Sequence, residues 1–219
     1  MAYALDGIRV LDVTQVMAGP FASMILCDMG ADVIKVESPS GDSSRRMAGS
    51  VGNDSPAFNA VNRGKRGLGL DLKTDRGSEI LRRLASSTDI FIENYRPGVM
   101  KKLGLDYATL KPGNPGLIYA SISGYGQTGP LANRGGFDLV AQGVSGLMSV
   151  TGEPDRPPVK VGIPVTDLGA GLFAVCGILG ALHHRDKTGE GQCVDSALVD
   201  AGVALSVWEA TQYFSRGVI

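Results

Sequence analysis

The strongest constraint on the fold is an alternation of strand-like and helix-like segments that starts near the amino terminus. RVLDVT (9–14) is apolar and β-branched, and DVIKVE (32–37) alternates as a strand does. Between them, AGPFASMILCDMG (18–30) has a proline near a first helical turn and ends at a glycine. A strand, a helical crossover and a second strand predict a parallel βαβ unit.

The alternation continues to the end of the sequence. Residues 38–66 read as a loop. The later segments with strand character are 67–72, 89–95, 117–126 and 192–198. Those with helix character are 74–87, with Thr74 as N-cap, and 96–105, 137–150, 167–187 and 199–216. The pattern predicts an α/β fold with a Rossmann-like open, mostly parallel sheet and flanking helices.

Composition excludes several classes of protein. The 219 residues are 43% hydrophobic and 20% charged, which is enough apolar material for a globular core. A net charge of −1 gives no overall attraction to nucleic acid or membranes. The most apolar run, 168–182, is shorter than the roughly 20 residues of a membrane helix, and the start lacks a secretory signal. We therefore expect a cytoplasmic protein without nucleic-acid or membrane partners.

Cysteine and histidine offer little chemistry. Cys27, Cys176 and Cys193 are widely spaced without a C-x-x-C motif, so neither a disulfide framework nor a zinc site is expected. Their apolar surroundings predict buried, inert thiols. His183 and His184 lie near a predicted helix end, which favours a capping or surface role. A Ser/His/Asp hydrolase therefore lacks a base, and the sequence has no G-x-S-x-G elbow.

The turn after the first strand, DVTQVMAGPFAS, lacks the G-x-G-x-x-G pattern of dinucleotide binding, which argues against a nicotinamide dehydrogenase. It nevertheless lies at the carboxyl end of a strand, where α/β sheets place ligands. Gln15 can donate and accept hydrogen bonds there, and a helix starting near Ala18 offers free N–H groups. The alternative is a plain strand-to-helix turn.

Basic residues gather near the later strand ends. They are Arg63, Lys65, Arg66, Lys73, Arg96, Lys101 and Lys102. They form either solvated faces or a site for a phosphorylated ligand, because Arg and Lys pair with phosphate. Asn94, Tyr95 and Arg96 end one strand and supply an amide, an aromatic ring and a guanidinium. An adenine nucleotide could use all three groups.

A single carboxylate, Asp167, lies within GIPVTDLGAG (162–171), directly before an apolar helix. One interpretation is an ordinary helix cap. The other is a nucleophile, since a carboxylate can act in covalent catalysis. The proline-limited segment before Asp167 holds it rigidly, and the small residues after it let a substrate or second chain approach. A helix N-terminus also favours the anion and offers N–H groups to an oxyanion.

Seven segments in this order resemble the family III CoA-transferases, the group of formyl-CoA transferase and carnitine/bile-acid CoA-transferase, over nearly the whole chain. They are VLDVTQVMAGPFAS, GADVIKVE, NRGKRGLGLDLKT, IENYRPGVMKKLGL, IYASISGYGQTGP, GIPVTDLGAG and HHRDKTGEGQ. The resemblance implies transfer of CoA from an acyl-CoA donor to a small carboxylic acid, through an aspartyl anhydride and an aspartyl-CoA thioester. Coenzyme A would then be a substrate, and no permanently bound cofactor is expected.

The resemblance assigns the nucleophile to Asp167. The expected CoA and substrate contacts are Gln15, Met17, Ala18, Ser38, Leu70, Asp71, Leu72, Lys73, Asn94, Tyr95, Arg96, Lys102, Ser123, Gly124, Tyr125 and Gly126. Four of these positions differ from residues found in relatives: Gln15, Met17, Ser38 and Ser123. Formyl or oxalyl specificity therefore stays open, whereas CoA binding can rest on Lys73, Arg96 and Lys102.

The resemblance also covers related α-methylacyl-CoA racemases, which carry a histidine base where this chain has Phe137. Phenylalanine cannot move a proton, so transfer is favoured over racemisation. Family members are longer and form interlocked dimers. Residues 1–219 are thus expected to form the CoA-binding, Rossmann-like large domain, without the small domain and the C-terminal return. Either a homodimer or a complementing C-terminal fragment would be its partner, and an inactive CoA-binding fragment is the remaining alternative.

Overall fold

The computed structural model describes residues 2–47, 49, 51 and 55–217. In this part of the chain, six strands form one sheet in the order β3-β2-β1-β4-β5-β6, and every neighbouring pair is parallel. The strands are β1 Arg9–Asp12, β2 Asp32–Glu37, β3 Arg66–Gly69, β4 Ile90–Glu93, β5 Ile118–Ser123 and β6 Cys193–Ala197. The order is that of a doubly wound Rossmann sheet, which reverses between β1 and β4. The predicted fold class is confirmed.

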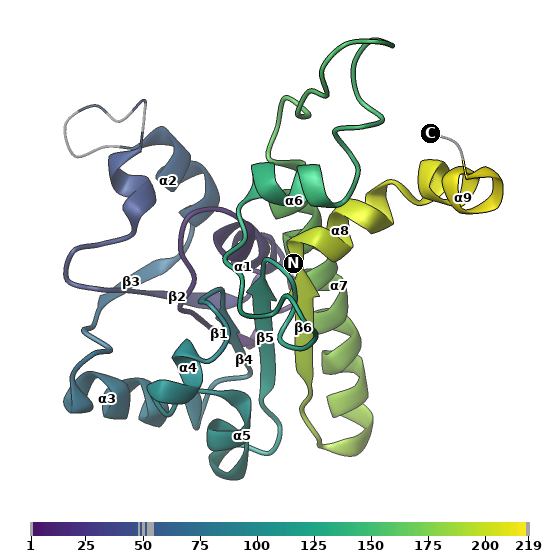
Figure 1. The fold of residues 1–219 in the computed structure, drawn as a ribbon. Helices are drawn as coiled ribbons and strands as arrows, with labels where there is room; N and C mark the ends of the chain where they lie inside the picture. Colours follow the sequence, from purple (N-terminus) through teal and green to yellow (C-terminus); the bar gives the residue numbers. More distant parts are fainter. Residues whose placement is uncertain (1, 48, 50, 52–54, 218–219) are drawn as a thin grey trace.

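Helices cover both faces of the sheet (Figure 1). One face carries α1 (Ala18–Asp28) and α7 (Val165–Thr188), and the other carries α3 (Asp75–Ala85), α4 (Val99–Lys102) and α5 (Tyr107–Leu110). The remaining helical segments are η1 Ser43–Arg46, α2 Pro56–Asn62, η2 Lys111–Gly113, α6 Asp138–Val144, α8 Leu198–Leu205 and α9 Val207–Arg216.

The central strands β1, β4 and β5 are buried on both faces, which is why they read as largely apolar runs. In β1, Val10 packs into the cluster beneath α1 and α7, together with Ala22 and Ile178. Its neighbour Leu11 points to the opposite cluster, with Leu81 of α3. Each central strand thus contributes to two cores, and the sheet is held between them.

The small residues after Asp167 serve helix packing within this chain. A methyl group at Gly171 would lie 2.8 Å from the carbonyl oxygen of Ala18, so α7 and α1 touch backbone to backbone. The close approach was expected for a substrate or second chain, and the structure instead fills it with α1. It brings the first turns of these two helices together at one end of the sheet.

The predicted helix 167–187 begins earlier, at Val165, with Pro164 as the N-cap residue. Asp167 therefore lies inside the first turn and is not the helix cap. At 24 residues, α7 is also the one helix in the described part of the chain with the length and apolar composition to cross a membrane. Half of its apolar window is buried inside this molecule, as in the core helix of a globular fold.

Other element predictions also need correction. The helix expected over 137–150 is limited to α6 (Asp138–Val144), and the one expected over 96–105 to α4 (Val99–Lys102). The expected loop 38–66 contains α2, which starts after the N-cap Ser55, whose hydroxyl accepts the N–H of Phe58 at 3.2 Å. The third strand stops at Gly69 instead of residue 72. The expected last helix divides at Ser206, whose hydroxyl donates to the carbonyl of Gly202 at 2.6 Å. Short polar caps of this kind compete with regular structure and leave little periodic signal.

The prediction that the three cysteines are buried is largely wrong. Cys176 and Cys193 are exposed, and only Cys27 is partly buried. Cys176 lies on the outer side of α7, and Cys193 begins the edge strand β6. The apolar neighbours in sequence belong to the inward side of these elements, which is why composition alone placed the thiols inside.

Candidate active site

Asp167 faces a cavity of about 400 Å3 at the carboxyl end of the sheet. The walls come from the turn after β1, the turn after β4, the segment before α6 and the first turn of α7. The lining residues are Gln15, Val16, Met17, Ala18, Asn94, Tyr95, Arg96, Gly136, Phe137 and Asp167. Seven of the predicted site residues thus meet in one place, at the edge where doubly wound sheets bind ligands.

The carboxylate that caps α7 belongs to Asp138, the first residue of α6. Its Oδ1 accepts the N–H of Thr166 at 2.9 Å, the hydroxyl of Thr166 at 2.7 Å and the N–H of Asp167 at 3.4 Å. This cap leaves the side chain of Asp167 free to face the cavity. Within the described residues, no group donates a hydrogen bond to its carboxylate.

Burial raises the pKa of Asp167 to about 7, and the negative charge of Asp138 adds to the shift. A carboxyl group with this pKa is partly protonated at neutral pH and a stronger nucleophile when ionised. Structural caps have ordinary or lowered values, because N–H groups stabilise the anion. The shift therefore distinguishes Asp167 from a cap and suits a reacting group.

A smaller cavity of about 80 Å3 adjoins the first and shares Tyr95, Arg96 and Phe137 with it. Predicted residues Ser123 and Gly124 line it, together with Arg134. Gly136 and Gly124 pack backbone against backbone in the wall of this smaller cavity. A methyl group at Gly136 would lie 2.3 Å from the Cα of Gly124, so a side chain has no room there. The Ser123–Gly126 turn closes when the Ser123 hydroxyl accepts the N–H of Gly126 at 3.0 Å.

The remaining predicted contacts lie outside the Asp167 cavity. Ser38 follows β2, residues 70–73 follow β3, Lys102 ends α4, and Tyr125 and Gly126 follow β5. Leu70 and Leu72 pack partly against the core beneath α3. Except for Lys102, these positions follow the carboxyl ends of strands. Their contacts with CoA stay predictions.

The basic residues split into two groups. Arg63 pairs with Asp28 and Arg66 with Asp32, so both are engaged within the protein. The side chain of Lys65 is only 2% exposed and is bound to Asp12, which excludes both predicted roles, a solvated face and a phosphate contact. In the part of the chain that the structure describes, no ion pair engages the other members, Lys73, Arg96, Lys101 and Lys102.

Asn94 binds the turn after β1. Its Nδ2 donates to the carbonyl of Gln15 at 2.8 Å, and its Oδ1 accepts the N–H of Gln15 at the same distance. The side-chain amide of Gln15 in turn donates to the Tyr95 hydroxyl at 3.1 Å. The first βα turn is therefore not a plain connection, since a second strand end fixes it from the side.

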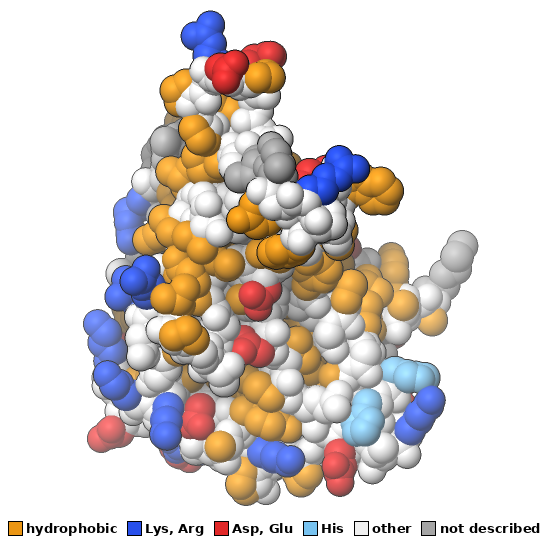
Figure 2. All heavy atoms as spheres, turned by 45° about the vertical axis from the view of Figure 1, so that its right-hand side comes forward, with side chains coloured by type: hydrophobic (Ala, Val, Ile, Leu, Met, Phe, Trp, Pro, Cys, Tyr) orange, Lys and Arg blue, Asp and Glu red, His pale blue; other side chains and the backbone are white. Residues whose placement is uncertain are grey.

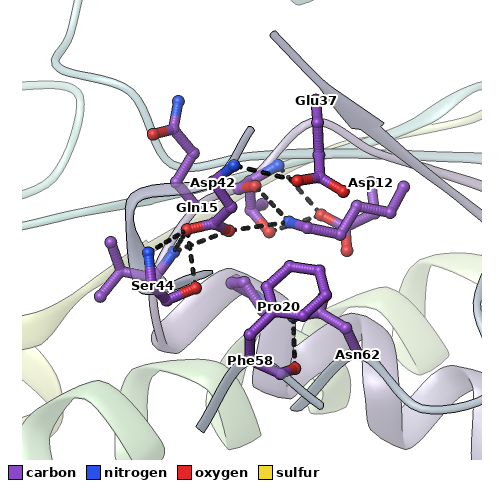
Figure 3. Close-up of polar contacts among 12 residues, drawn as sticks. Asp12, Gln15, Pro20, Glu37, Asp42, Ser44, Phe58 and Asn62 are labelled. Carbon is purple, nitrogen blue, oxygen red and sulfur yellow. Dashed lines mark hydrogen bonds and ion pairs between the residues drawn. The ribbon is translucent and has the colours of Figure 1, made fainter. Parts of the chain in front are cut away.

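Four buried charged residues lie beneath the same turn and were not identified from the sequence as a group. Lys65 pairs with Asp12 at 2.9 Å and Lys35 with Asp42 at 3.1 Å, and none of these side chains is more than 2% exposed. Figure 3 shows Asp42 and Ser44 beside Gln15, with Asp12 across the cluster. Burying a charge costs several kcal/mol unless it is well paired.

Burial alone would raise the pKa of Asp12. The charges of Lys65 and Lys35, with hydrogen bonds from Ser23 and Thr14, outweigh it and lower the pKa to about 2. Asp12 is therefore ionised at any physiological pH and is a fixed charge of the fold.

Val16 has a left-handed backbone, with φ of 68°. This conformation costs roughly 1–3 kcal/mol for a residue other than glycine, and a β-branched side chain makes it rarer still. Both carboxylate oxygens of Asp42 accept the N–H of Val16 at 3.2 Å. Sequence reasoning missed Val16, although Lys35 within the apolar strand DVIKVE was a signal that a buried charge needed a partner.

Glu93, at the end of β4, was also missed. Its carboxylate accepts the N–H of Tyr95 at 2.8 Å and contacts the hydroxyl of Ser121. Burial raises its pKa to about 7, with a smaller contribution from Asp195. Its backbone contact orients Tyr95 in the cavity wall. Among the described residues, no group of three histidine, cysteine, aspartate or glutamate side chains is placed to hold a metal ion.

Fold and site together define a Rossmann-type α/β protein with a half-buried carboxylate, Asp167, facing a cavity at the carboxyl edge of its sheet. Residues 5–219 match the family model described as CoA-transferase family III, and the chain belongs to that family. The sequence resemblance is thereby confirmed.

Curated relatives carry CoA-transferase names. The chain is 45% identical over 221 residues to a succinate–glutarate CoA-transferase of Agrobacterium fabrum, covering 97% of this chain and 55% of the relative. It is 48% identical over 223 residues to a succinyl-CoA:mesaconate CoA-transferase of Haloarcula hispanica, covering 98% and 56%. The chain thus spans about half the length of these relatives.

A solved structure shows the same fold. The crystal structure of a CAIB/BAIF family protein from Brucella suis superposes with a TM-score of 0.95 at 44% identity, covering 100% of this chain and 59% of that one.

Proposed function

We propose that this protein transfers coenzyme A from an acyl-CoA donor to a carboxylic acid, with Asp167 as the covalent nucleophile. The observation that carries the proposal is the half-buried carboxylate of Asp167, which faces the cavity without a hydrogen-bond donor among the described residues. The named functions of the relatives support the same reaction.

The proposed reaction begins when an Asp167 carboxylate oxygen attacks the thioester carbonyl carbon. The C–S bond breaks, the CoA thiolate leaves, and a mixed anhydride forms on Asp167. The thiolate then attacks the Asp167 carbonyl carbon, which releases the donor acid and leaves an aspartyl-CoA thioester. Two steps replace one difficult substitution.

The second half runs in reverse with a new acid. The acceptor carboxylate attacks the aspartyl thioester and expels the thiolate, and a second anhydride forms. The thiolate attacks the acceptor's acyl carbon, which gives the new acyl-CoA and restores Asp167. No net proton is taken up or released. Holding the thiolate beside the anhydride makes each return step intramolecular, worth effective molarities of about 10⁵ M or more.

The acceptor that we propose is a short dicarboxylic acid. The relatives are named for succinate, glutarate and mesaconate, which share two carboxylates. Arg96 lines both cavities near Asp167, and Arg134 lines the smaller one. A guanidinium can bind a carboxylate bidentately, so either arginine suits the second carboxylate of the acceptor.

Phe137 supports transfer over racemisation. It lines the cavity with Asp167, is 73% exposed and offers no exchangeable proton. A racemase would need a base at this position. Deuterium exchange at the α-carbon of an acyl-CoA, without an acceptor acid, would restore the racemase alternative.

We also propose that this chain is part of a larger assembly, such as the interlocked dimer that the family resemblance implies. Apolar side chains gather on the face of Figure 2 above the two histidines of α7. Leu172 and Phe173 of α7 are among the exposed apolar residues, as are Trp208 and Phe214 of α9. The cytoplasmic location likewise stays a prediction.

The direct test is a panel of acyl-CoA donors and dicarboxylic acids with the wild-type chain and Asp167→Asn. We expect transfer by the wild type and a loss of about three orders of magnitude or more in the variant. Undiminished transfer by Asp167→Asn would refute the nucleophile. Binding of CoA in calorimetry without any transfer by the wild type would favour the CoA-binding fragment instead.

A further inference from the structure

The buried charges beneath the cavity have no role in the proposed chemistry. We call Asp12, Lys35, Asp42 and Lys65 the buried quartet. None of them lines the Asp167 cavity. Charged side chains are almost never fully buried unless paired, and a buried pair is often no more stabilising than apolar residues of the same size. Stability alone therefore gives no reason for two such pairs in one place.

The contacts of the quartet converge on one short backbone segment, which we call the Val16 turn (residues 14–17). Asp12 accepts the N–H of Thr14 at 2.9 Å. Lys35 donates to the carbonyl of Thr14 at 2.8 Å. Asp42 accepts the N–H of Val16 at 3.2 Å. Buried charges thus satisfy backbone groups that a strand or helix would otherwise pair.

Lys65 extends the same arrangement to the helix that follows. Its ammonium donates to the carbonyl of Pro20 in the first turn of α1, at 2.9 Å. Asp12, its ion-pair partner, also accepts the hydroxyl of Ser23 at 2.6 Å. The quartet therefore holds both the Val16 turn and the start of α1, the two segments that bring Gln15, Met17 and Ala18 to the cavity.

The left-handed backbone of Val16 shows why such fixation is needed. An unrestrained β-branched residue would leave this region of backbone space. Relaxation of Val16 would move Met17 and the first turn of α1 relative to Asp167, because they follow in the chain without a break.

We propose that the buried quartet is a positioning device, which holds Val16 in its left-handed conformation and so fixes the cavity wall that residues 15–18 form beside Asp167. Its members are positioning residues, since none touches the reacting atoms. The consequence for turnover rests on the proposed function, whereas the fixation of the turn does not.

Two double variants distinguish the charge of the Lys35–Asp42 pair from the hydrogen bond that Asp42 accepts from the N–H of Val16. Lys35→Met/Asp42→Asn removes the ion pair and the Lys35 bond to the Thr14 carbonyl, but keeps a side-chain oxygen for the N–H of Val16. Lys35→Met/Asp42→Leu also removes the acceptor for the N–H of Val16, so the difference between the two variants isolates that contact. The matched control is Glu79→Gln/Arg82→Met, which removes an exposed ion pair of α3 away from the cavity.

The readouts are amide hydrogen exchange of residues 14–18, CoA binding by calorimetry, and kcat and KM of transfer. For Lys35→Met/Asp42→Leu we expect exchange at least about tenfold faster in the turn, about tenfold weaker CoA binding and a kcat about 100-fold lower. The Asn variant also lacks the Lys35 bond to Thr14, so it should fall below wild type but lie at least about threefold closer to it than the Leu variant in all three readouts, which gives partial rescue by the conservative change. The control should match wild type.

Equal values for the Leu and Asn variants in all three readouts would overturn the proposal. Faster amide exchange in the Val16 turn with unchanged CoA binding and kcat would overturn it as well. Exchange and CoA binding need no turnover. A wild-type chain without transfer would thus refute the proposed function, and amide exchange and CoA binding would still test whether the quartet positions the turn.

If the Leu variant does not fold, amide exchange of the wild-type chain tests the proposal. Its Thr14 and Val16 amides must exchange as slowly as those of β1, and exchange at loop rates contradicts the proposal.

Discussion

At the scale of single residues, the ionisation of Asp167 should determine the pH dependence of the transfer rate. The attacking species is the carboxylate, and the pKa of Asp167 is raised to about 7 by burial and by Asp138. The kcat/KM of transfer should therefore rise with pH and level off above pH 7, with a roughly tenfold loss at one pH unit below the pKa. In Asp138→Asn, which keeps an oxygen for the cap, the profile should move to lower pH. An unchanged profile would contradict the coupling of the two carboxylates.

Asp167 should also lower the free energy of unfolding at pH values above its native pKa. Between its ordinary pKa of 3.8 and its native value of about 7, Asp167 holds a proton in the folded state and releases it in the unfolded chain. Stability contributed by this group therefore falls as the pH rises through that window and stays lost above it. Asp167→Asn should raise the free energy of unfolding at pH 8 by roughly 1–3 kcal/mol, but have little effect at pH 4. Urea titration at both pH values measures this, and an equal effect at both would be inconsistent with the shift.

The family resemblance assigned Asp167, Gln15, Met17 and residues 94–96 to one site, and all of them line the Asp167 cavity. The sequence did not show that Asp138 supplies the cap of α7, since the contact spans 28 residues in the chain. Lys65 looked like a surface cation because nothing local reveals its burial against Asp12.

At the scale of elements, the approach of α1 to α7 sets the cavity. A methyl group at Gly171 would meet the Ala18 carbonyl at 2.8 Å, whereas one at Gly180, on the same helix, meets nothing within 4 Å. Gly171→Ala should destabilise the fold by about 1–3 kcal/mol and weaken CoA binding. Gly180→Ala should stabilise it by about 0.5–1 kcal/mol, since alanine favours a helix over glycine. Thermal unfolding of both variants tests this, and equal shifts in Tm would argue against the close contact.

The boundaries of helices and strands were predicted well where the apolar pattern is regular and poorly where it is not. The βαβ unit at 9–37 was predicted closely, since its strands are apolar and its helix, which ends at Asp28, is followed by Gly30 after the C-cap Met29. Thr74 was confirmed as an N-cap, accepting the N–H of Gly77 at 3.0 Å. The missed helix α2 is short, and its Ser55 cap lies within a segment rich in polar residues and glycine. Tertiary contacts decide such segments more than their own periodicity does.

At the scale of the whole molecule, a Rossmann sheet supplies the scaffold, and the turns after β1 and β4, the segment before α6 and the first turn of α7 form the walls of the Asp167 cavity. Fold and family followed from the sequence because both depend on patterns that run through the entire chain. The buried quartet did not, because its members come from separate segments and only folding brings them together.

In the proposed reaction, an Asp167 carboxyl oxygen becomes covalently bonded to the acyl carbon of the substrate acid. The most direct measurement uses an acceptor acid labelled with oxygen-18 in both carboxylates and mass spectrometry of the Asp167 peptide. In the proposed sequence the acceptor leaves one of its oxygens on Asp167 in each turnover, so the peptide should gain the label when acyl-CoA is present and remain unlabelled without it. Transfer that proceeds while Asp167 stays unlabelled would contradict the account.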